Sequence, residues 1–388
     1  MNIFKKIMLP ISCLAVLFTA GCAKKSEAYY AYTNIPSGQY TVKDSSFKFE
    51  FIEGLEEKEE SFESKDLSAF TSKGWTRYGI VEAQLIVSDD FTKEGAETKL
   101  DSLKVDIIAL LDAIDKAVST SVANSDITKF NEAEAGATLE ISKTGYEILS
   151  EAYETYVFSE GFYNPALYYN VLAYGFGSSH VYPENSSKLP KDATIAKYTD
   201  LATHFGEITL NEQEGRYFVT KPEYTVEIEG ESISMSLDLG GISKGYAVDR
   251  IEELFDSYGY DYGMFNYGSS SMLLRGNIRE GNYSLGLINP RSRRRDSYIE
   301  VPARNKKLST SGDNEQYYTF DGVRYCHIID PTTGKPVQKG IMSVTVIGGG
   351  AAEDDALTTA IMCMGKDKAI EFIKEKLTDR RVIFTYGA

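Results

Sequence analysis

The sequence predicts an α+β fold, with mixed or antiparallel sheets packed against helices, in place of a doubly wound sheet. Apolar residues recur at helical spacing early in the chain, in Leu100–Val118 and Tyr146–Val157. Short stretches with strand-like alternation then follow in hairpin-like succession: Gly263–Tyr267, Met272–Arg275, Tyr283–Ile288, Lys306–Thr310, Arg324–Ile329, Met342–Ile347 and Arg381–Tyr386. Successive strands beside packed helices favour the α+β class.

Residues 1–22 have the pattern of a bacterial lipoprotein signal peptide. Lys5 and Lys6 form a positive n-region, residues 7–18 are apolar but too few to span a bilayer comfortably, and a small-residue site ends at Cys22. We therefore expect Cys22 to be lipidated and the protein to be anchored at the extracytoplasmic face of the cell membrane. An ordinary secretory signal with a coincidental cysteine is the alternative.

Polar residues after Cys22 predict a tether over residues 23–45, followed by one functional domain over residues 46–388. Strand-like alternation is expected at Phe47–Phe51 and from Tyr78 to Val87. The chain of 388 residues is long enough for one large or two smaller domains. Its 57 acidic and 41 basic residues give a net charge of −16, which argues against nucleic acid as a partner because phosphate-backbone binding needs a basic face.

The segment Asp238–Asp249, with sequence DLGGISKGYAVD, is a candidate anion site. A short strand ends at Asp238, two glycines allow a tight turn, and Lys244 stands at the start of a helix. Glycines let the backbone approach a ligand closely, and helix-start N–H groups with an ammonium favour a phosphate or carboxylate. An ordinary connection between a strand and a helix is the alternative explanation of these residues.

Three further motifs follow in order: STSGD at Ser309–Asp313, YCHIIDPTTGKP at Tyr325–Pro336, and SVTVIGGGAAEDDALTTAIMCMG from Ser343. Together with the DLGG segment they resemble the ApbE family of FAD:protein FMN transferases. The resemblance covers roughly residues 100–388, and residues 46–99 are then a divergent N-terminal part. It implies a T-shaped fold with FAD between its two halves.

The resemblance also implies a function. The protein would use Mg²⁺ to cleave FAD, attach FMN through a phosphoester bond to a Thr or Ser of an extracytoplasmic protein with an FMN-binding domain, and release AMP. Phosphoryl transfer of this kind depends on positioning and on neutralising phosphate charge. An FAD-binding or FAD-hydrolysing lipoprotein without a protein acceptor is the alternative. A solute-binding lipoprotein fits the signal peptide but not the motifs.

A metal site is expected at the helix that carries the last motif. Asp355 and Thr359 stand four residues apart, so they share one helix face. Without the resemblance, Asp354 or Asp355 could be an acid that stabilises a helix N-terminus. The resemblance implies that Asp355 and Thr359 bind Mg²⁺ together with the backbone carbonyl of Gly241, with Thr358 beside them. Such hard oxygen ligands suit Mg²⁺.

The resemblance assigns flavin contacts and a catalytic group. Asp238 and Lys244 would contact FAD, and Ile329 would line the flavin pocket. His327 would be catalytic, since an imidazole with a pKa near neutrality can accept or orient the proton of the target hydroxyl. A structural histidine in a strand is the alternative for His327.

Several flavin-contact positions depart from the family pattern. Tyr78 is the nearest candidate for a first flavin contact, where the family opens with Met-Gly-Thr. Ser121 stands where an aromatic ring is usual, and its loss would loosen FAD. Tyr174 replaces a tryptophan and is a flavin-facing candidate, although an aromatic packed under a glycine turn explains it as well. In Asn266–Ser271, a run of serines stands where the family usually has N-x-G-G-(D/N/S), which changes the polarity of this segment.

Overall fold

The computed structural model describes most of the chain, and side chains are described from residue 98 onward. Cys22 and Tyr78 lie outside the described residues. The described ranges are 29–33, 41–42, 47–51, 68–76, 79–87, 93–177, 189–260, 263–276, 283–292 and 296–386.

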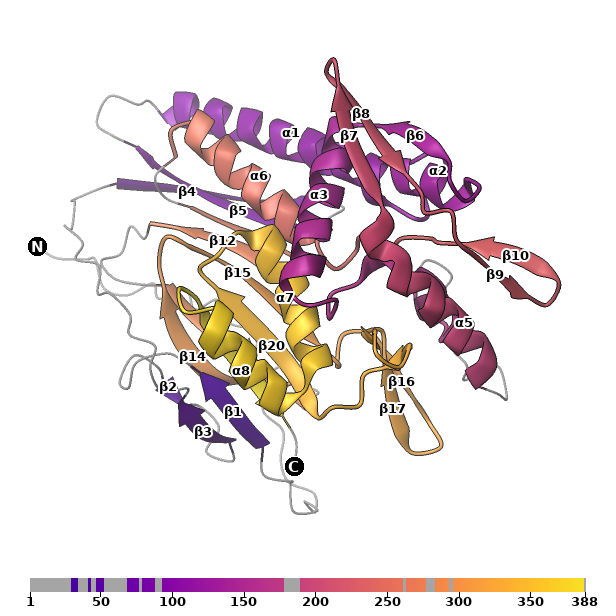
Figure 1. Ribbon diagram of the computed structural model, residues 1–388. Coiled ribbons are helices and arrows are strands. Elements are labelled where there is room, and N and C mark those ends of the chain that lie inside the picture. Colours follow the sequence, from indigo (N-terminus) through magenta and orange to yellow (C-terminus); the bar gives the residue numbers. More distant parts are fainter. Residues whose placement is uncertain are drawn as a thin grey trace, which may run out of the picture.

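A large twisted sheet forms the centre of the structure (Figure 1). Its strands lie in the order β3-β1-β21-β20-β15-β12-β11-β5-β4. Neighbouring strands are antiparallel, except that β1 and β3 run parallel. The strands are β1 (Tyr29–Thr33), β3 (Phe47–Phe51), β4 (Ser68–Thr76), β5 (Gly79–Val87), β11 (Gly263–Tyr267), β12 (Ser271–Arg275), β15 (Lys306–Gly312), β20 (Ile341–Ile347) and β21 (Arg381–Tyr386).

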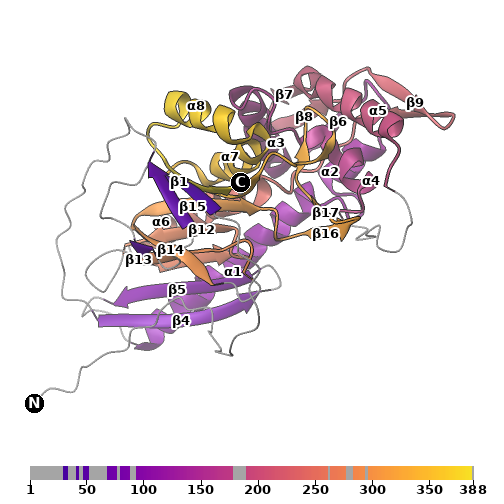
Figure 2. The ribbon, with the colours of Figure 1, turned by 90° about the horizontal axis from the view of Figure 1, so that it is seen from below.

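Helices cover one face of this sheet, as Figure 2 shows from below. They are α1 (Lys93–Val118), α6 (Ser243–Ser257), α7 (Ala351–Met364) and α8 (Lys366–Lys376). Helix α1 contacts β4 and β5, α6 contacts β11 and β12, and α7 contacts β15 and β20. Helices α6 and α7 also pack directly against each other, so the segments of two sequence motifs meet at this junction.

The other face of the sheet packs on a small second sheet of β13 (Tyr283–Ile288), β14 (Ser297–Ala303) and β2 (Thr41–Val42). Strand alternation sends successive side chains to opposite faces. In β21, Val382 and Phe384 therefore join the core under the helices, while Ile383 joins the core under the small sheet. This two-sided burial explains the almost continuous apolar composition of the central strands.

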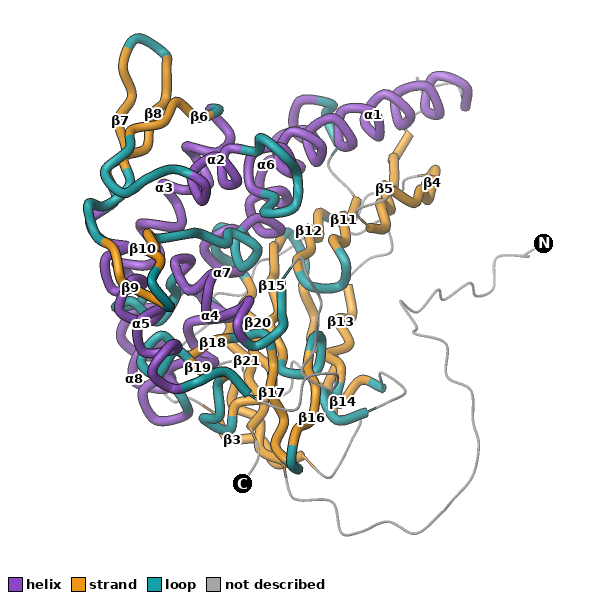
Figure 3. Tube along the Cα trace, turned by 90° about the vertical axis from the view of Figure 1, so that its right-hand side faces the viewer, coloured by secondary structure: helices purple, strands orange, loops and turns teal. Residues whose placement is uncertain are grey.

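Residues 126–177 and 189–234 form a second part that extends beyond the large sheet (Figure 3). Helix α3 ties this part to the rest because it packs on α7. The helices are α2 (Asp126–Glu132), α3 (Lys143–Phe158), η1 (Pro165–Leu167), α4 (Tyr168–Ala173), α5 (Asp192–Thr203) and η3 (His204–Glu207), and the strands are β6 (Thr138–Ile141), β7 (Thr209–Gln213), β8 (Arg216–Thr220), β9 (Thr225–Ile228) and β10 (Glu231–Ser234). Two hairpins, β16 (Tyr317–Phe320) with β17 (Val323–Cys326) and β18 (Ile329–Asp330) with β19 (Lys335–Pro336), lie between β15 and β20 in the sequence.

The predicted α+β class is confirmed, and the structure differs from the sequence expectations at two places. The segment expected to be a tether, 23–45, contains β1 and β2. Strand β1 has the sequence YYAYT, which is rich in strand-forming residues, and it pairs with β21. The strand expected to end at Asp238 stops at Ser234, the last residue of β10, so residues 235–238 lead into the turn without strand structure. Within the described ranges, no helix combines the length and the apolar character needed to cross a bilayer.

Candidate functional site

The DLGG turn is held in place from both sides. The backbone N–H of Asp238 donates to the carbonyl of Pro165 at 2.9 Å, and its carboxylate Oδ1 accepts from the N–H of Gly240 at 2.8 Å. The carbonyl of Leu239 then accepts from the N–H of Ser243 at 3.1 Å, which starts helix α6. Hydrogen bonds therefore connect the segment before the turn, the turn itself and the start of α6.

Gly245 allows helix α6 to approach helix α7 closely. A Cβ atom at this position would lie 2.0 Å from the carbonyl oxygen of Ala351, so only glycine fits. The N–H of Gly245 donates to Oδ2 of Asp355 at 3.0 Å. This contact joins the DLGG segment to the DDALTTA helix.

Asp355 is a buried carboxylate, with an exposed fraction of 2%. Burial raises the pKa of Asp355, while the charge of Lys244, the Gly245 N–H and the side chain of Ser271 each lower it. The hydroxyl of Ser271 also accepts a 3.0 Å hydrogen bond from Ser309. Since these donors compensate the burial only in part, a cation bound at this carboxylate would be favourable.

Hydroxyl groups gather beside Asp355. Thr358 Oγ1 donates to the Asp355 carbonyl at 2.6 Å and lies 2.7 Å from Ser311 Oγ, which in turn lies 3.3 Å from Thr359 Oγ1. Thr359 Oγ1 lies 3.8 Å from the point where a Cβ of Gly241 would be. The structure thus brings Thr358, Thr359 and Gly241 together beside Asp355, and their role as Mg²⁺ ligands stays a prediction.

This cluster fits Mg²⁺ better than a transition metal. Among the residues whose side chains are described, no three His, Cys, Asp or Glu side chains gather in a metal-binding group. A metal held here would have one carboxylate, from Asp355, with neutral oxygens from Thr359 and the Gly241 carbonyl. Mg²⁺ accepts such hard ligands and commonly completes its shell with water and substrate phosphate.

Lys244 acts electrostatically on Asp238, Asp355 and His327. Its half-buried ammonium lies 3.4 Å from the carbonyl of Gly240. Its charge lowers the pKa values of Asp355 and Asp238, against the larger opposite effect of burial on both groups. It also lowers the pKa of His327. The lysine therefore supplies positive charge within reach of both carboxylates and the imidazole.

His327 sits at the end of β17 with a neutral imidazole. Burial, followed by the charge of Lys244, lowers the pKa of His327 to about 4, below the near-neutral value expected from the sequence. Its Nδ1 lies 3.4 Å from the carbonyl of Gln316. A carbonyl only accepts, so we assign the proton to Nδ1, which leaves Nε2 as a proton acceptor. The ring also meets Phe176 edge-on, with centroids 6.4 Å apart.

Of three other residues predicted to contact the flavin, two are buried and one is exposed. Ile329 is buried in the core, and its carbonyl accepts from the thiol of Cys363 at 3.4 Å. Tyr174 is buried and stacks on Tyr325, with centroids 6.2 Å apart. Ser121 is exposed and its hydroxyl lies 3.1 Å from that of Ser119. Flavin contacts of Ile329, Tyr174 and Ser121 stay predictions.

Sequence reasoning assigned no role to several residues that support the site. Ser271 contacts Asp355, and Ser311 contacts Thr358 and Thr359. Only the position of these serines within sequence motifs could have indicated such a role. The amide of Asn131 donates to the Leu237 carbonyl at 3.0 Å and accepts from the Leu237 N–H at 2.7 Å, which fixes the residue before Asp238. No sequence signal pairs Asn131 with Leu237.

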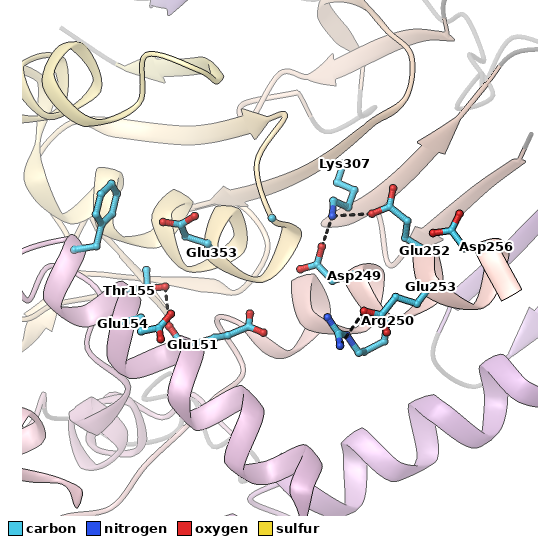
Figure 4. Close-up of a pocket in the computed structure, with 12 residues that line it drawn as sticks. Glu151, Glu154, Thr155, Asp249, Arg250, Glu252, Glu253, Asp256, Lys307 and Glu353 are labelled. Carbon is cyan, nitrogen blue, oxygen red and sulfur yellow. Dashed lines mark hydrogen bonds and ion pairs between the residues drawn. The ribbon is translucent and has the colours of Figure 1, made fainter. Parts of the chain in front are cut away.

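A separate pocket of about 710 Å³ lies between α3, α6 and the start of α7 (Figure 4). Seven carboxylates and two cationic side chains line it. Burial, followed by the charge of Asp249, raises the pKa of Glu151 to about 7. Asp249 accepts from the N–H groups of Ala351 and Ala352 and pairs with Lys307, so it caps helix α7. The excess of negative charge makes this pocket unsuitable for FAD phosphates.

Comparisons with known proteins agree with the motifs. The model of the ApbE family matches residues 81–384. A protein of Klebsiella pneumoniae (strain 342), named FAD:protein FMN transferase, is 27% identical over 281 residues, covering 72% of this chain and 76% of that protein. A protein of the same name from Treponema pallidum (strain Nichols) is 26% identical over 278 residues, covering 70% and 73%.

Solved structures show the same fold. The flavin transferase ApbE from Vibrio cholerae has a TM-score of 0.64 at 23% identity, covering 83% of this chain and 98% of that one. The ApbE protein from Thermotoga maritima has a TM-score of 0.64 at 22% identity, covering 81% and 94%. Since the family model matches more than half of the sequence, the chain belongs to the ApbE family.

Proposed function

We propose that the protein is an Mg²⁺-dependent FAD:protein FMN transferase. It would cleave FAD between its phosphates, join FMN through a phosphoester bond to a Thr or Ser hydroxyl of an extracytoplasmic flavoprotein, and release AMP. The observation that carries the proposal is the cluster at the α6–α7 junction. There a buried carboxylate, Asp355, stands beside the Thr358 and Thr359 hydroxyls, the Gly241 turn and the Lys244 ammonium.

The chain's own residues supply binding and charge at this cluster. The Lys244 ammonium would attract phosphate oxygens. The carboxylate of Asp238, which accepts from the Gly240 N–H, would hold the turn that positions Lys244. Asp355, Thr359 and the Gly241 carbonyl would hold Mg²⁺, which supplies neutralisation of phosphate charge when bound. This local positive charge would let a protein with a net charge of −16 bind an anionic substrate.

His327 would act on the acceptor hydroxyl. As the hydroxyl oxygen forms its bond to the FMN phosphorus, its proton would pass to Nε2 of His327, while the bond from that phosphorus to the bridging oxygen breaks. The bridging oxygen leaves with AMP. The neutral imidazole has a free acceptor for this role because Nδ1 is directed at the Gln316 carbonyl.

We further propose that the protein works at the outer face of the cell membrane, anchored through lipidated Cys22. The support is the signal-like pattern of residues 1–22 alone. Labelling with a radioactive fatty acid in a bacterial host, compared with Cys22→Ala, tests this. Equal labelling of the two proteins would contradict it.

The transferase proposal is tested by incubating the purified protein with FAD, Mg²⁺ and a candidate FMN-binding domain. We expect in-gel flavin fluorescence on the acceptor and one AMP released for each FMN attached. Chelation with EDTA should stop both signals. AMP release without a labelled acceptor would indicate an FAD pyrophosphatase instead, and FAD binding without any product would indicate a flavin-binding lipoprotein.

A further inference from the structure

Tyr163 carries a buried hydroxyl with no hydrogen-bond partner in the structure. The side chain is 3% exposed, so bulk water does not replace the missing partner. Burying an unpaired hydroxyl is unfavourable, and such groups in native proteins call for an explanation. A bound ligand that accepts from this hydroxyl is one such explanation.

The backbone around Tyr163 is bonded to the flavin-site turn. The Tyr163 N–H donates to Ser159 Oγ at 3.0 Å, which fixes the residue at the end of helix α3. Two residues later, the Pro165 carbonyl accepts from the N–H of Asp238 at 2.9 Å. The backbone at Tyr163 is therefore bonded to Ser159 on one side and, through Pro165, to the DLGG segment on the other.

The ring of Tyr163 points into the cluster at the α6–α7 junction. Its Cε2 atom, next to the carbon that bears the hydroxyl, lies 3.4 Å from the point where a Cβ of Gly241 would be. Thr359 Oγ1 lies 3.8 Å from the same point. The hydroxyl-bearing edge of the ring and the threonine hydroxyl thus converge on Gly241.

The Tyr163 hydroxyl is a hydrogen-bond donor, because a tyrosine phenol is protonated at neutral pH. Neither carboxylate of the site, Asp238 or Asp355, accepts from it. A neutral phenol is also a weak metal ligand, whereas an anionic oxygen is a strong acceptor for it.

We propose that the Tyr163 hydroxyl binds the dinucleotide substrate, donating a hydrogen bond to a phosphate oxygen held beside Gly241 and Thr359. This inference rests on the proposed function, because it takes FAD as the ligand of the cluster. It adds a substrate-binding group from a third segment of the chain to the two motif segments at the α6–α7 junction. The charge of the phosphate makes this hydrogen bond stronger than one between neutral groups.

The test is Tyr163→Phe, which removes only the hydroxyl. Binding of FAD with Mg²⁺ and of riboflavin, which has no phosphate, is followed by flavin fluorescence, and thermal unfolding of the ligand-free protein by circular dichroism. We expect FAD affinity to fall about tenfold or more, since a hydrogen bond to a charged group typically contributes about 1.5–3 kcal/mol. Riboflavin affinity should stay within about twofold, and the ligand-free unfolding temperature should not fall, because the lost hydroxyl had no partner.

Tyr260→Phe is the matched control. Tyr260 is 2% exposed and its hydroxyl also has no partner, but it follows the C-terminal end of α6, away from Asp355 and Gly241. It should leave FAD affinity unchanged. Unchanged FAD affinity in Tyr163→Phe would overturn the inference, and so would equal losses of FAD and riboflavin binding with a lower unfolding temperature.

The inference and the proposed function fail in different ways. If the wild-type protein transfers FMN and Tyr163→Phe binds FAD equally well, only the inference is overturned. If the wild-type protein binds no FAD in the presence of Mg²⁺, the proposed function is overturned and the inference with it.

Discussion

Asp354 and Asp355 are neighbours at the start of helix α7, and both are buried, yet their surroundings differ. Asp354 Oδ1 lies 3.0 Å from Nη1 of Arg380, and Oδ2 accepts from the Gly349 N–H at 2.9 Å. Asp355 instead meets the Gly245 N–H and the hydroxyl of Ser271. Asp354 thus has a guanidinium ion pair, whereas Asp355 has only neutral donors at hydrogen-bond distance and the more remote charge of Lys244.

The difference follows from helix geometry. Successive residues on an α-helix point about 100° apart, so two adjacent acids face different neighbours. Asp354 faces the loop before β21 that carries Arg380, and Asp355 faces the start of α6. Asp354 stabilises the N-terminal end of α7, whereas Asp355 can still bind a cation. The predictions below test this division of roles.

The largest effect on folding is expected from Arg380→Met, which leaves Asp354 buried without its cation. Removing one partner of a buried ion pair typically costs about 3–5 kcal/mol of unfolding free energy. Urea unfolding of wild type and variant measures the loss. FMN transfer per folded molecule should stay near the wild-type rate, so a parallel loss of transfer would contradict the separation of the two acids.

The unfolding free energy lost in Arg380→Met should also depend on pH. Burial already raises the pKa of Asp354 to about 7 with Arg380 in place. A carboxyl whose folded-state pKa is raised stabilises the fold at low pH and loses this contribution as pH rises through the folded pKa. The stability difference between Arg380→Met and wild type should therefore be larger at pH 8 than at pH 5. Equal differences would show that Asp354 does not carry the charge left behind.

His327→Asn should reduce FMN transfer by about a hundredfold or more, the lower range for loss of a general base. FAD binding should change by less than about threefold, because His327 is expected to act on the acceptor hydroxyl. Transfer rates and FAD titrations on the same preparations measure the two effects. Equal losses of binding and transfer, with a lower unfolding temperature, would support a structural histidine.

Transfer by the wild-type protein should persist at unusually low pH. With a pKa of about 4 in the ligand-free protein, His327 stays neutral down to about pH 5. The folded-state pKa is depressed below the ordinary 6.5, so the stability contribution of His327 is lost as pH falls from about 6.5 through 4. The profile of kcat/KM for FAD should therefore bend near pH 4. A bend near pH 6.5 would contradict the buried, lysine-influenced environment.

The smallest effect concerns the loop at Ser121. Ser121→Tyr should tighten FAD binding by roughly 0.5–1.5 kcal/mol, up to about tenfold, if a ring there stacks on the flavin. Tighter ground-state binding need not accelerate transfer. Fluorescence titration measures the change. Because Ser121 is exposed and bonded to Ser119, the substitution disturbs no buried contact, so an unchanged or weaker affinity would mean that this loop does not face the isoalloxazine.

Local patterns predicted the elements that build the site. The four-residue spacing of Asp355 and Thr359 placed both on one helix face, and the two glycines before Ile242 indicated a tight turn into a helix. Alternation located most strands of the large sheet, including β3 and β5, although β1 and β4 were not predicted. These signals depend on neighbours within a few residues, which the sequence shows directly.

Contacts between distant segments could not be predicted in the same way. The pairing of Asp354 with Arg380 spans the whole of α7 and α8, and that of Asn131 with Leu237 joins α2 to the residue before the turn. Either acid of the Asp354–Asp355 pair could have faced α6, since the pattern of apolar residues around them is similar. Likewise, the burial that lowers the pKa of His327 comes from packing that the HxIDP motif does not encode.

The most direct test of the account compares Asp355→Ala with Asp354→Asn. FAD cleavage is measured as AMP release with Mg²⁺ and an acceptor domain, and circular dichroism checks that each variant is folded. The account predicts that Asp355→Ala is folded and releases no detectable AMP, because it loses the one carboxylate of the metal site, while folded Asp354→Asn cleaves FAD at a rate close to wild type. Wild-type AMP release by Asp355→Ala in the presence of Mg²⁺ would contradict the assignment of this cluster as the metal and phosphate site.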